Sequence, residues 1–319
     1  MNVELLIAHN NKLYQPIVEE GIQWTTERAG SPSTLKFTVV KDDIIAFQEG
    51  DPVRMKVDGQ EVFFGFVFTK KRDKQHHIEV TAYDQLRYLK NKDTYVYENK
   101  TASQVIQMIA NDFNLNLGTI EQTSFVIPSR VEDNQSLFDI IQNALDLELR
   151  NKGELYCLYD NFGKLTLKNI ASMKLDLLID KDTAENFSYT SSIDQQTYNK
   201  IKLTYDNDKT GEREVYITKD SSKINSWGVL QYYEKLQKGE NGKAKADALL
   251  KLYNQKTRNL KVDNAFGDLR CRAGSLIPVQ LYLGDMTVSS YLLVEKATHD
   301  FKNDQHLMSL NLRGGEFIV

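Results

Sequence analysis

Histidines are the first residues to test for chemistry, because imidazole binds metal ions and moves protons near neutral pH. The candidate metal ligands gather in two expected hairpin turns: His76, His77, His299, His306, Asp300 and Asp304. A metal site needs three or four converging ligands, and the spacing of these residues fixes no such geometry. We interpret both segments as solvated hairpin turns and leave a weak metal site as the alternative.

One segment has the start of a calcium-binding loop. Asp206, Asp208 and Gly211 follow the pattern D-x-D-x-x-G. The twelfth position of such a loop carries a bidentate Glu in an EF-hand, and here it is Ile217. A hairpin loop between two strands accounts for the same residues, so we expect no calcium site there.

Paired carboxylates, which a glycosidase needs on opposite sides of a cleft, occur at Asp42-Asp43 and Glu19-Glu20. With 44 acidic residues in the chain, such pairs arise by chance. The sequence also lacks the G-x-S-x-G, H-E-x-x-H, G-x-G-x-x-G, Walker A and C-x-x-C motifs. We therefore predict no catalytic, cofactor-binding or metal-binding residues, no cofactor and no enzymatic activity.

The composition is that of a soluble globular protein. At roughly 150 residues per domain, a chain of 319 residues has room for about two. Its 40 basic and 44 acidic residues give a net charge of −4, which argues against specific nucleic-acid binding. No apolar run approaches the roughly 20 residues of a membrane helix, and the N-terminus does not resemble a signal peptide. We expect no membrane insertion, a cytoplasmic origin, and reduced thiols at Cys157 and Cys271.

A basic stretch at 238–261 holds seven Lys or Arg and two acidic residues. Its apolar positions are typical of a helix packed on a barrel, and its cations are typical of a solvated face. Nucleic acid, a membrane surface or an acidic partner remain alternatives for this stretch.

The first ninety residues have the pattern of short strands separated by turns, which indicates a small barrel or sandwich. The expected strands are 3–8, 34–40, 52–57, 61–69 and 77–84. Asp58-Gly59 is a strong hairpin signal, and Gly65 inside a strand indicates a bulge or a close backbone approach.

Two helices and a hairpin follow. Apolar residues recur at helical spacing in 101–115, where Thr101 and Gln104 have capping-box spacing, and again in about 135–150. A hairpin is expected from 154–160 and 164–169. Beyond it the pattern predicts strands at 199–206, 212–219, 276–283, 290–299 and 306–313, with a helix at about 241–257.

The sequence contains an internal repeat. The segment Gly50–Val57 aligns with Gly274–Leu281, and the two strands that follow each of them also correspond, at an offset of about 224–229 residues. If the repeat is real, one chain carries two similar barrels around a helical unit. A ring of such chains then has twice its true symmetry at the level of the barrels.

Several motifs carry a family resemblance. They are G-D-P-V at 50–53, F-G-F-V at 64–67, T-A-Y-D-Q-L-R-Y-L at 81–89, T-A-S-Q-V-I at 101–106, K-G-E-L-Y at 152–156, Y-D-N-F-G-K-L at 159–165 and R-G-G at 313–315. With these motifs the chain resembles the tail hub proteins of contractile phages, in particular the hub proteins of PBSX-like defective prophages and phage tail-like bacteriocins.

The resemblance implies a structural baseplate hub with a β-rich α+β fold. Expected are two tube-like β-barrel domains, at 1–95 and 186–319, and an inserted α+β unit at 96–185. Such hubs form a homotrimer, a pseudo-sixfold ring that joins the hexameric tail tube to a trimeric spike. The implied partners are the tail tube protein, the spike protein, the tape-measure protein and other baseplate proteins.

The resemblance also implies assembly in the bacterial host cytoplasm and release by lysis, within a phage or a DNA-free tail-like particle. Because the sequence stops at Val319, just after its second barrel, spike and wall-degrading activities are expected on a separate chain. Two other functions stay open at this point: a cell-wall hydrolase with a cleft between β domains, and a carbohydrate-binding module.

Overall fold

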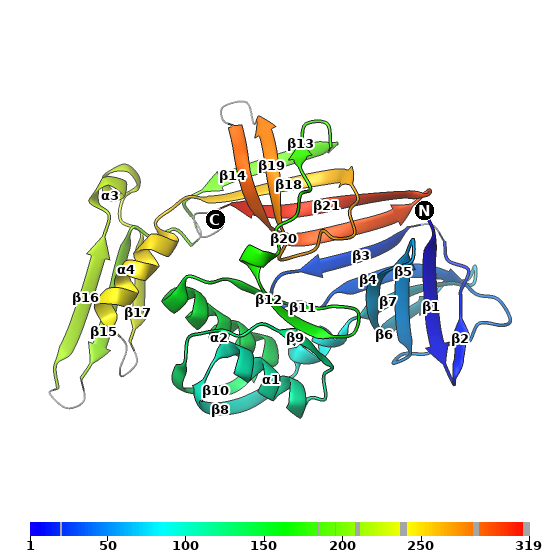
Figure 1. Ribbon diagram of the computed structural model, residues 1–319, viewed down its shortest axis with the longest axis horizontal. Coiled ribbons are helices and arrows are strands. Elements are labelled where there is room, and N and C mark those ends of the chain that lie inside the picture. Colours follow the sequence, from blue (N-terminus) through cyan, green and yellow to red (C-terminus); the bar gives the residue numbers. More distant parts are fainter. Residues whose placement is uncertain are drawn as a thin grey trace.

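The computed structural model describes residues 1–19, 21–183, 185–194, 196–207, 211–236, 241–282 and 287–314. Figure 1 shows a long sheet, a compact helical unit below it and a small unit that projects at one side. Parts of several predictions lie outside the described residues: Glu20, Asp208 and its loop at 208–210, 238–240 of the basic stretch, position 283 of the strand predicted at 276–283, Gly315 and Val319.

Two groups of six strands have the same order within the long sheet. The first order is β3-β4-β7-β6-β5-β1 and the second is β14-β18-β21-β20-β19-β13. The first group comprises β1 (Val3–His9), β3 (Ile22–Glu27), β4 (Thr34–Val40), β5 (Pro52–Val57), β6 (Gln60–Arg72) and β7 (His77–Tyr83). The second comprises β13 (Ile179–Asp180), β14 (Asn186–Ser192), β18 (Thr257–Phe266), β19 (Leu276–Tyr282), β20 (Thr287–Lys302) and β21 (Gln305–Gly314). The shared order confirms the internal repeat.

The two groups form one continuous sheet, because β20 pairs with β3 and joins them. Among the described residues, the path of paired strands is open at β14 and at β2 (Lys12–Tyr14). Each group still encloses its own hydrophobic core, as alternating strands require. The groups differ at one position, since β1 runs antiparallel to β5 whereas β13 runs parallel to β19.

Gly65 confirms the predicted close backbone approach in β6. A Cβ atom at this position would lie 2.3 Å from the backbone oxygen of Tyr83. We expect Gly65→Ala to lower the free energy of unfolding by about 2–3 kcal/mol, because backbone cannot yield as a side chain can. Urea denaturation would measure the change. Gly314→Ala is the matched control, since its Cβ would meet side-chain atoms alone, the end of Leu292 at 3.1 Å and the Cβ of Arg258 at 3.9 Å. An equal loss in both variants would contradict the explanation.

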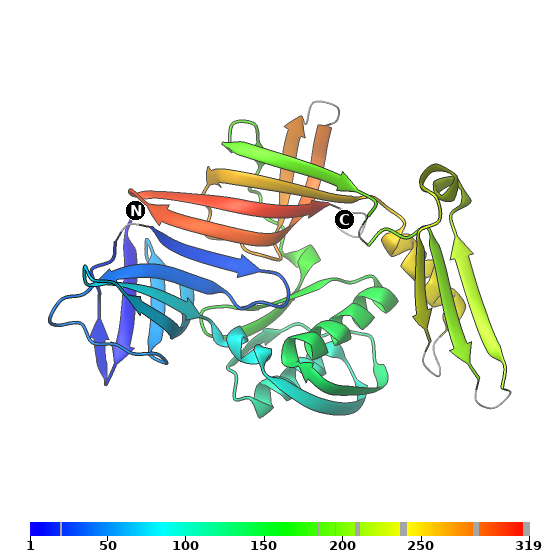
Figure 2. The ribbon, with the colours of Figure 1, turned by 180° about the vertical axis from the view of Figure 1, so that it is seen from behind.

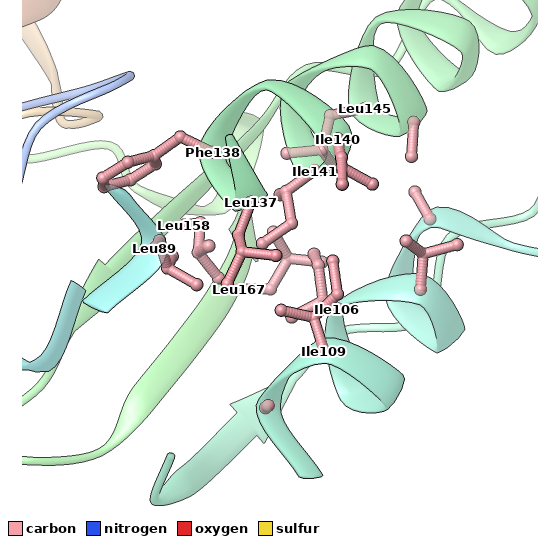
Figure 3. Close-up of a cluster of buried hydrophobic side chains, with 14 of the residues drawn as sticks. Leu89, Ile106, Ile109, Leu137, Phe138, Ile140, Ile141, Leu145, Leu158 and Leu167 are labelled. Atoms are coloured by element: carbon pink, nitrogen blue, oxygen red, sulfur yellow. The ribbon is translucent and has the colours of Figure 1, made fainter. Parts of the chain in front are cut away.

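The α+β unit lies under the junction of the two strand groups (Figure 1). Its elements are η1 (Gln85–Lys90), β8 (Lys92–Lys100), α1 (Ala102–Asp112), β9 (Leu117–Ile120), β10 (Ile127–Ser136), α2 (Leu137–Lys152), β11 (Tyr156–Asp160) and β12 (Leu165–Asn169). Figure 3 shows the apolar faces of α1 and α2 packed against β11 and β12. The capping box of Thr101 and Gln104 is confirmed. Helix α2 ends at Lys152, and its C-cap residue Gly153 is in the left-handed conformation.

The projecting unit is inserted between β14 and β18. It contains β15 (Lys200–Asp206), β16 (Arg213–Lys219), α3 (Ser221–Trp227), β17 (Gln231–Lys235) and α4 (Gly242–Tyr253). Its strands form a separate sheet in the order β16-β15-β17, and α4 packs on that sheet through Ala246 and Leu249. The predicted helix therefore exists but ends at Tyr253, and it packs on this small sheet rather than on a barrel.

Candidate assembly interface

The two strand groups meet at one junction, which we call the internal seam: β3 paired with residues 296–301 of β20. The pairing is antiparallel and places Glu27 opposite Lys296 and Ile22 opposite Phe301. Beyond the seam, the backbone N–H of Arg28 donates to the oxygen of Glu295 at 3.0 Å. Two copies of one fold are thus held edge to edge by strand pairing.

Side chains reinforce the internal seam. Glu27 accepts from Lys296 at 2.7 Å, Gln23 donates to Asp300 at 2.9 Å, and the hydroxyls of Thr25 and Thr298 lie 3.2 Å apart. These pairs sit on partly buried positions, where cross-strand contacts stabilise a sheet. At the end of the seam, the Glu295 carboxylate forms ion pairs with Arg28 at 2.7 Å and with Arg313 at 2.8 Å.

Matching irregularities align the two groups residue by residue. The register of β6 against β7 shifts between Val67 and Thr69, and the register of β20 against β21 shifts between Val294 and Lys296. Gly50 donates its N–H to the oxygen of Val67, just as Gly274 donates to the oxygen of Val294. The position in β6 that corresponds to residue n of β20 is therefore n − 227 on either side of this bulge.

This alignment identifies two strand edges that lack the partner found at the internal seam. The counterpart of β20 is β6, whose residues 67–72 pair with β7 on one side and with no described strand on the other. The counterpart of β3 is β14, whose one partner among the described strands is β18. Unpaired strand edges expose backbone donors and acceptors that another chain can pair with.

The histidine prediction is wrong for one of the two turns. His299 lies within β20, fully buried, with its ring stacked 4.8 Å from that of Trp24. Its Nε2–H donates to the oxygen of Cys271 at 2.8 Å, so its Nδ1 accepts from His306 at 2.8 Å. Burial and the neighbouring His306 lower the pKa of His299 to about 3. Side chains alternate between the two faces of β20, and this alternation, rather than a hairpin turn, places the His299 side chain in the interior.

The other histidine segment lies at the surface. His76 is exposed, and His77 lies beside Asp73 and Glu19 at 3.2 and 3.3 Å. Across the described parts of the chain, no three His, Cys, Asp or Glu side chains are grouped so that they could hold a metal ion.

The other carboxylate candidates stabilise turns and hairpins. Asp206 binds Arg213 and Lys235, both at 2.6 Å, and these hydrogen bonds lower the pKa of its carboxyl group to about 2. Asp42 accepts from the backbone N–H groups of Ile44 and Ile45 and so fixes a surface loop.

One buried pair of carboxylates joins three parts of the molecule. Asp84 follows β7, Asp160 ends β11, and Arg272 precedes β19. Asp160 accepts from Gln85 at 2.7 Å, and the guanidinium of Arg272 lies over the Tyr159 ring at 3.8 Å and donates to the backbone oxygen of Asp160.

Burial and the nearby Asp160 carboxylate raise the pKa of Asp84 well above its usual range, and burial raises that of Asp160. The two residues are only 1% and 7% exposed. A hydrolase needs its carboxylates open to substrate, so this pair has the placement of a structural junction rather than of a catalytic site.

Both cysteines are unpaired and buried, as predicted. Burial raises the pKa of the Cys157 thiol to about 11 and that of Cys271 to about 12. Neither thiol is therefore a reactive thiolate at neutral pH. No helix of the described chain is both long and apolar enough to span a bilayer.

The strand predictions missed β3, which forms the internal seam, and its counterpart β14. Neither 22–27 nor 186–192 was among the predicted strands, although Ile22, Trp24 and Thr26 alternate as a half-buried strand does. In β14, the corresponding signal is confined to Phe187 and Tyr189 among polar residues.

This fold is the fold of phage tail and secretion-system proteins. It is similar to the 43 kDa tail protein of prophage MuSo2 from Shewanella oneidensis, with a TM-score of 0.72 and 13% identity over 99% of this chain and 100% of that chain. It is also similar to the E. coli c3393 protein, with a TM-score of 0.59 and 10% identity over 98% and 78% of the two chains. That protein is described as a type VI secretion component similar in structure to the T4 tail proteins gp27 and gp5.

Over residues 22–313 the chain matches the YQBQ-like family, and it belongs to that family. Two relatives come from Bacillus subtilis (strain 168): the phage-like element PBSX protein XkdQ, 29% identical, and YqbQ, 28% identical. Each match spans 97% of this chain and 96% of the relative. These matches confirm the predicted relationship to PBSX-like phage tail and baseplate proteins and support a structural role in a phage tail.

Proposed function

We propose that the chain is the baseplate hub of a contractile phage tail or tail-like particle, a trimeric ring between a hexameric tail tube and a trimeric spike. The observation that carries this proposal is the internal seam. It joins two copies of one strand order edge to edge, and each copy leaves one equivalent edge open. Three chains supply six such units, which matches a sixfold tube on one side and a threefold spike on the other.

The internal seam gives the register of the seam between chains. Inside the chain, Thr298 pairs with Thr25. In the alignment of the two strand groups Lys71 corresponds to Thr298 and Thr190 to Thr25, so Lys71 of one chain would lie opposite Thr190 of the next chain. The same transfer places Thr69 opposite Ser192 and Arg72 opposite Tyr189. Residues 67–72 of β6 would then complete their pairing, and β14 would gain its second neighbour.

The side chains at these positions suit each other. Where Arg28 and Glu295 form an ion pair inside the chain, the seam between chains brings together two apolar residues, Ile193 and Phe68. Where the ring of Trp24 stacks on His299, the equivalent pair is Tyr189 and Arg72, and a guanidinium stacks well on an aromatic ring.

Cross-linking tests this seam. The variant Lys71→Cys/Thr190→Cys should form disulfides between chains under mild oxidation, because the Thr25 and Thr298 hydroxyls at the equivalent positions lie 3.2 Å apart. Non-reducing electrophoresis should show ladders up to three chains. The control Lys70→Cys/Thr190→Cys points one side chain to the opposite face and should link far less, since alternate strand residues face opposite sides.

Light scattering provides the independent measurement of assembly. A species near three times the 36.7 kDa chain mass supports the ring, and a strict monomer at every concentration, together with absence from tail particles, overturns the proposal. The native thiols do not confuse the cross-linking result, because both are buried.

The remaining parts of the chain fit the same role. The similarity of the E. coli c3393 protein to gp27 and gp5, as stated for that protein, supports contact of this chain with spike and baseplate proteins. The tape-measure protein or DNA would pass through the ring, and a net charge of −4 suits a channel to which DNA does not adhere. The α+β unit would lie outside the ring, and the finished particle would leave the host cytoplasm by lysis.

A further inference from the structure

The projecting unit leaves one whole face of its sheet uncovered. Helix α4 packs on one face, over Ile201, Leu203 and Tyr232. Figure 2 views the unit from the other side, with the strands in front of α4. In the described residues of this unit, no other helix or strand packs on that open face.

Strand pairing fixes which side chains lie together on the open face. Ile217, Lys202 and Tyr233 form one row across the three strands, and the next row is Val215, Thr204 and Lys235. The row beyond Ile217 holds Lys219, Lys200 and Gln231. The row beyond Val215 holds Arg213 and Asp206.

The centre of this face is apolar and exposed. Val215 is 48% exposed, Ile217 50% and Tyr233 55%. Scattered apolar side chains on a surface need no explanation, but a contiguous group framed by charges marks an interaction site. Tyr233 is also held in place, because its hydroxyl lies 3.0 Å from that of Thr204.

The charges of the face are strongly unbalanced. It carries five cationic side chains and one carboxylate, although the whole chain has a net charge of −4. The carboxylate, Asp206, is already bound to Arg213 and Lys235. Within the described residues, Lys200, Lys202 and Lys219 have no ion pair.

We infer that this face, with Val215, Ile217 and Tyr233 at its centre and three unpaired lysines around them, is a docking surface for an acidic protein. Charge complementarity gives the sign of the partner. The aliphatic centre favours protein over nucleic acid, because single strands bind through stacked aromatic rings and this face has one. The inference rests on the proposed function for the place of docking, which is another baseplate protein outside the ring.

A photo-crosslinker tests the identity of the occupant in assembled particles. Benzoylphenylalanine at Ile217 should crosslink to a different protein, at a segment with a net negative charge. The matched position is Val131, which is 67% exposed on the α+β unit and should give a different product or none. A product with nucleic acid, with a second copy of this chain or with a basic segment overturns the inference, as does no product in particles that contain the chain.

A second measurement uses the purified chain and does not depend on particle assembly. If the chain does not enter particles, that result counts against the proposed function alone, and the second measurement still tests the inference. The probe is a fluorescein-labelled peptide of alternating Glu and Leu, followed by anisotropy. The variant Lys200→Glu/Lys202→Glu/Lys219→Glu should bind it at least tenfold more weakly than the unaltered chain. The control Lys12→Glu/Lys90→Glu/Lys92→Glu makes the same charge change elsewhere, and equal weakening in both variants contradicts a specific face.

Discussion

Replacing Arg272 with Met is expected to lower the free energy of unfolding by about 3 kcal/mol at neutral pH, because it leaves two buried carboxyl groups without their cation. Asp84 and Asp160 come from different units, and Arg272 from a third position in the chain. Loss of the Arg272 cation should therefore weaken the attachment of the α+β unit to both strand groups. Urea unfolding followed by tryptophan fluorescence measures this change in stability, since Trp24 donates to Ser33, whose backbone N–H donates to Asp84.

The pH dependence of this variant separates electrostatics from packing. Burial and Asp160 already raise the pKa of Asp84, so protonation should relieve the defect and the loss should shrink as the pH falls. Arg270→Met is the control, because its side chain is 56% exposed and binds Asp176 and Asp268 at the surface. A loss of stability that is equal in the two variants, or unchanged with pH, would contradict this role for Arg272.

Acid should destabilise the chain through His299. Its folded-state pKa, about 3, lies below the ordinary value of 6.5, so the unfolded chain binds a proton that the folded chain does not. Stability is then full above pH 6.5 and falls by up to about 1.4 kcal/mol per pH unit below it, until the folded pKa is reached. The pKa of His306 is also lowered by burial, which adds to the slope.

The variant His299→Gln should have a shallower slope between pH 6.5 and pH 4, whatever its stability at neutral pH. An amide retains a donor for the Cys271 oxygen but takes up no proton in this range. Denaturant unfolding at fixed protein concentration gives the slopes. His76→Gln, at an exposed position, should leave the slope unchanged, and an unaltered slope in His299→Gln would refute the explanation.

Elements governed by local patterns were predicted well from the sequence. The strands at 34–40 and 52–57 have the predicted bounds, and Thr101 caps α1 as its spacing with Gln104 indicates. Alternation and capping act between residues a few positions apart, so a short segment of sequence is enough to predict them. The repeat was also visible, because two copies of the same local pattern can be compared directly.

The internal seam could not be predicted in the same way. Glu27 and Lys296 are 269 positions apart, and nothing in either segment specifies the other. His299 shows the same limit, since its flanking turn residues suggested solvent whereas a strand from the other unit covers it. The open face of the projecting sheet likewise depends on which side α4 occupies, and this became clear only from the packing.

Joining two units within one chain also changes how a ring closes. Half of the seams in a six-unit ring would already be made when each chain folds, because the internal seam forms at the high effective concentration of a tethered pair. Only three contacts between molecules would remain. A collar of this kind could then form at subunit concentrations too dilute for six separate units, and its completion would depend on meeting two further molecules rather than five.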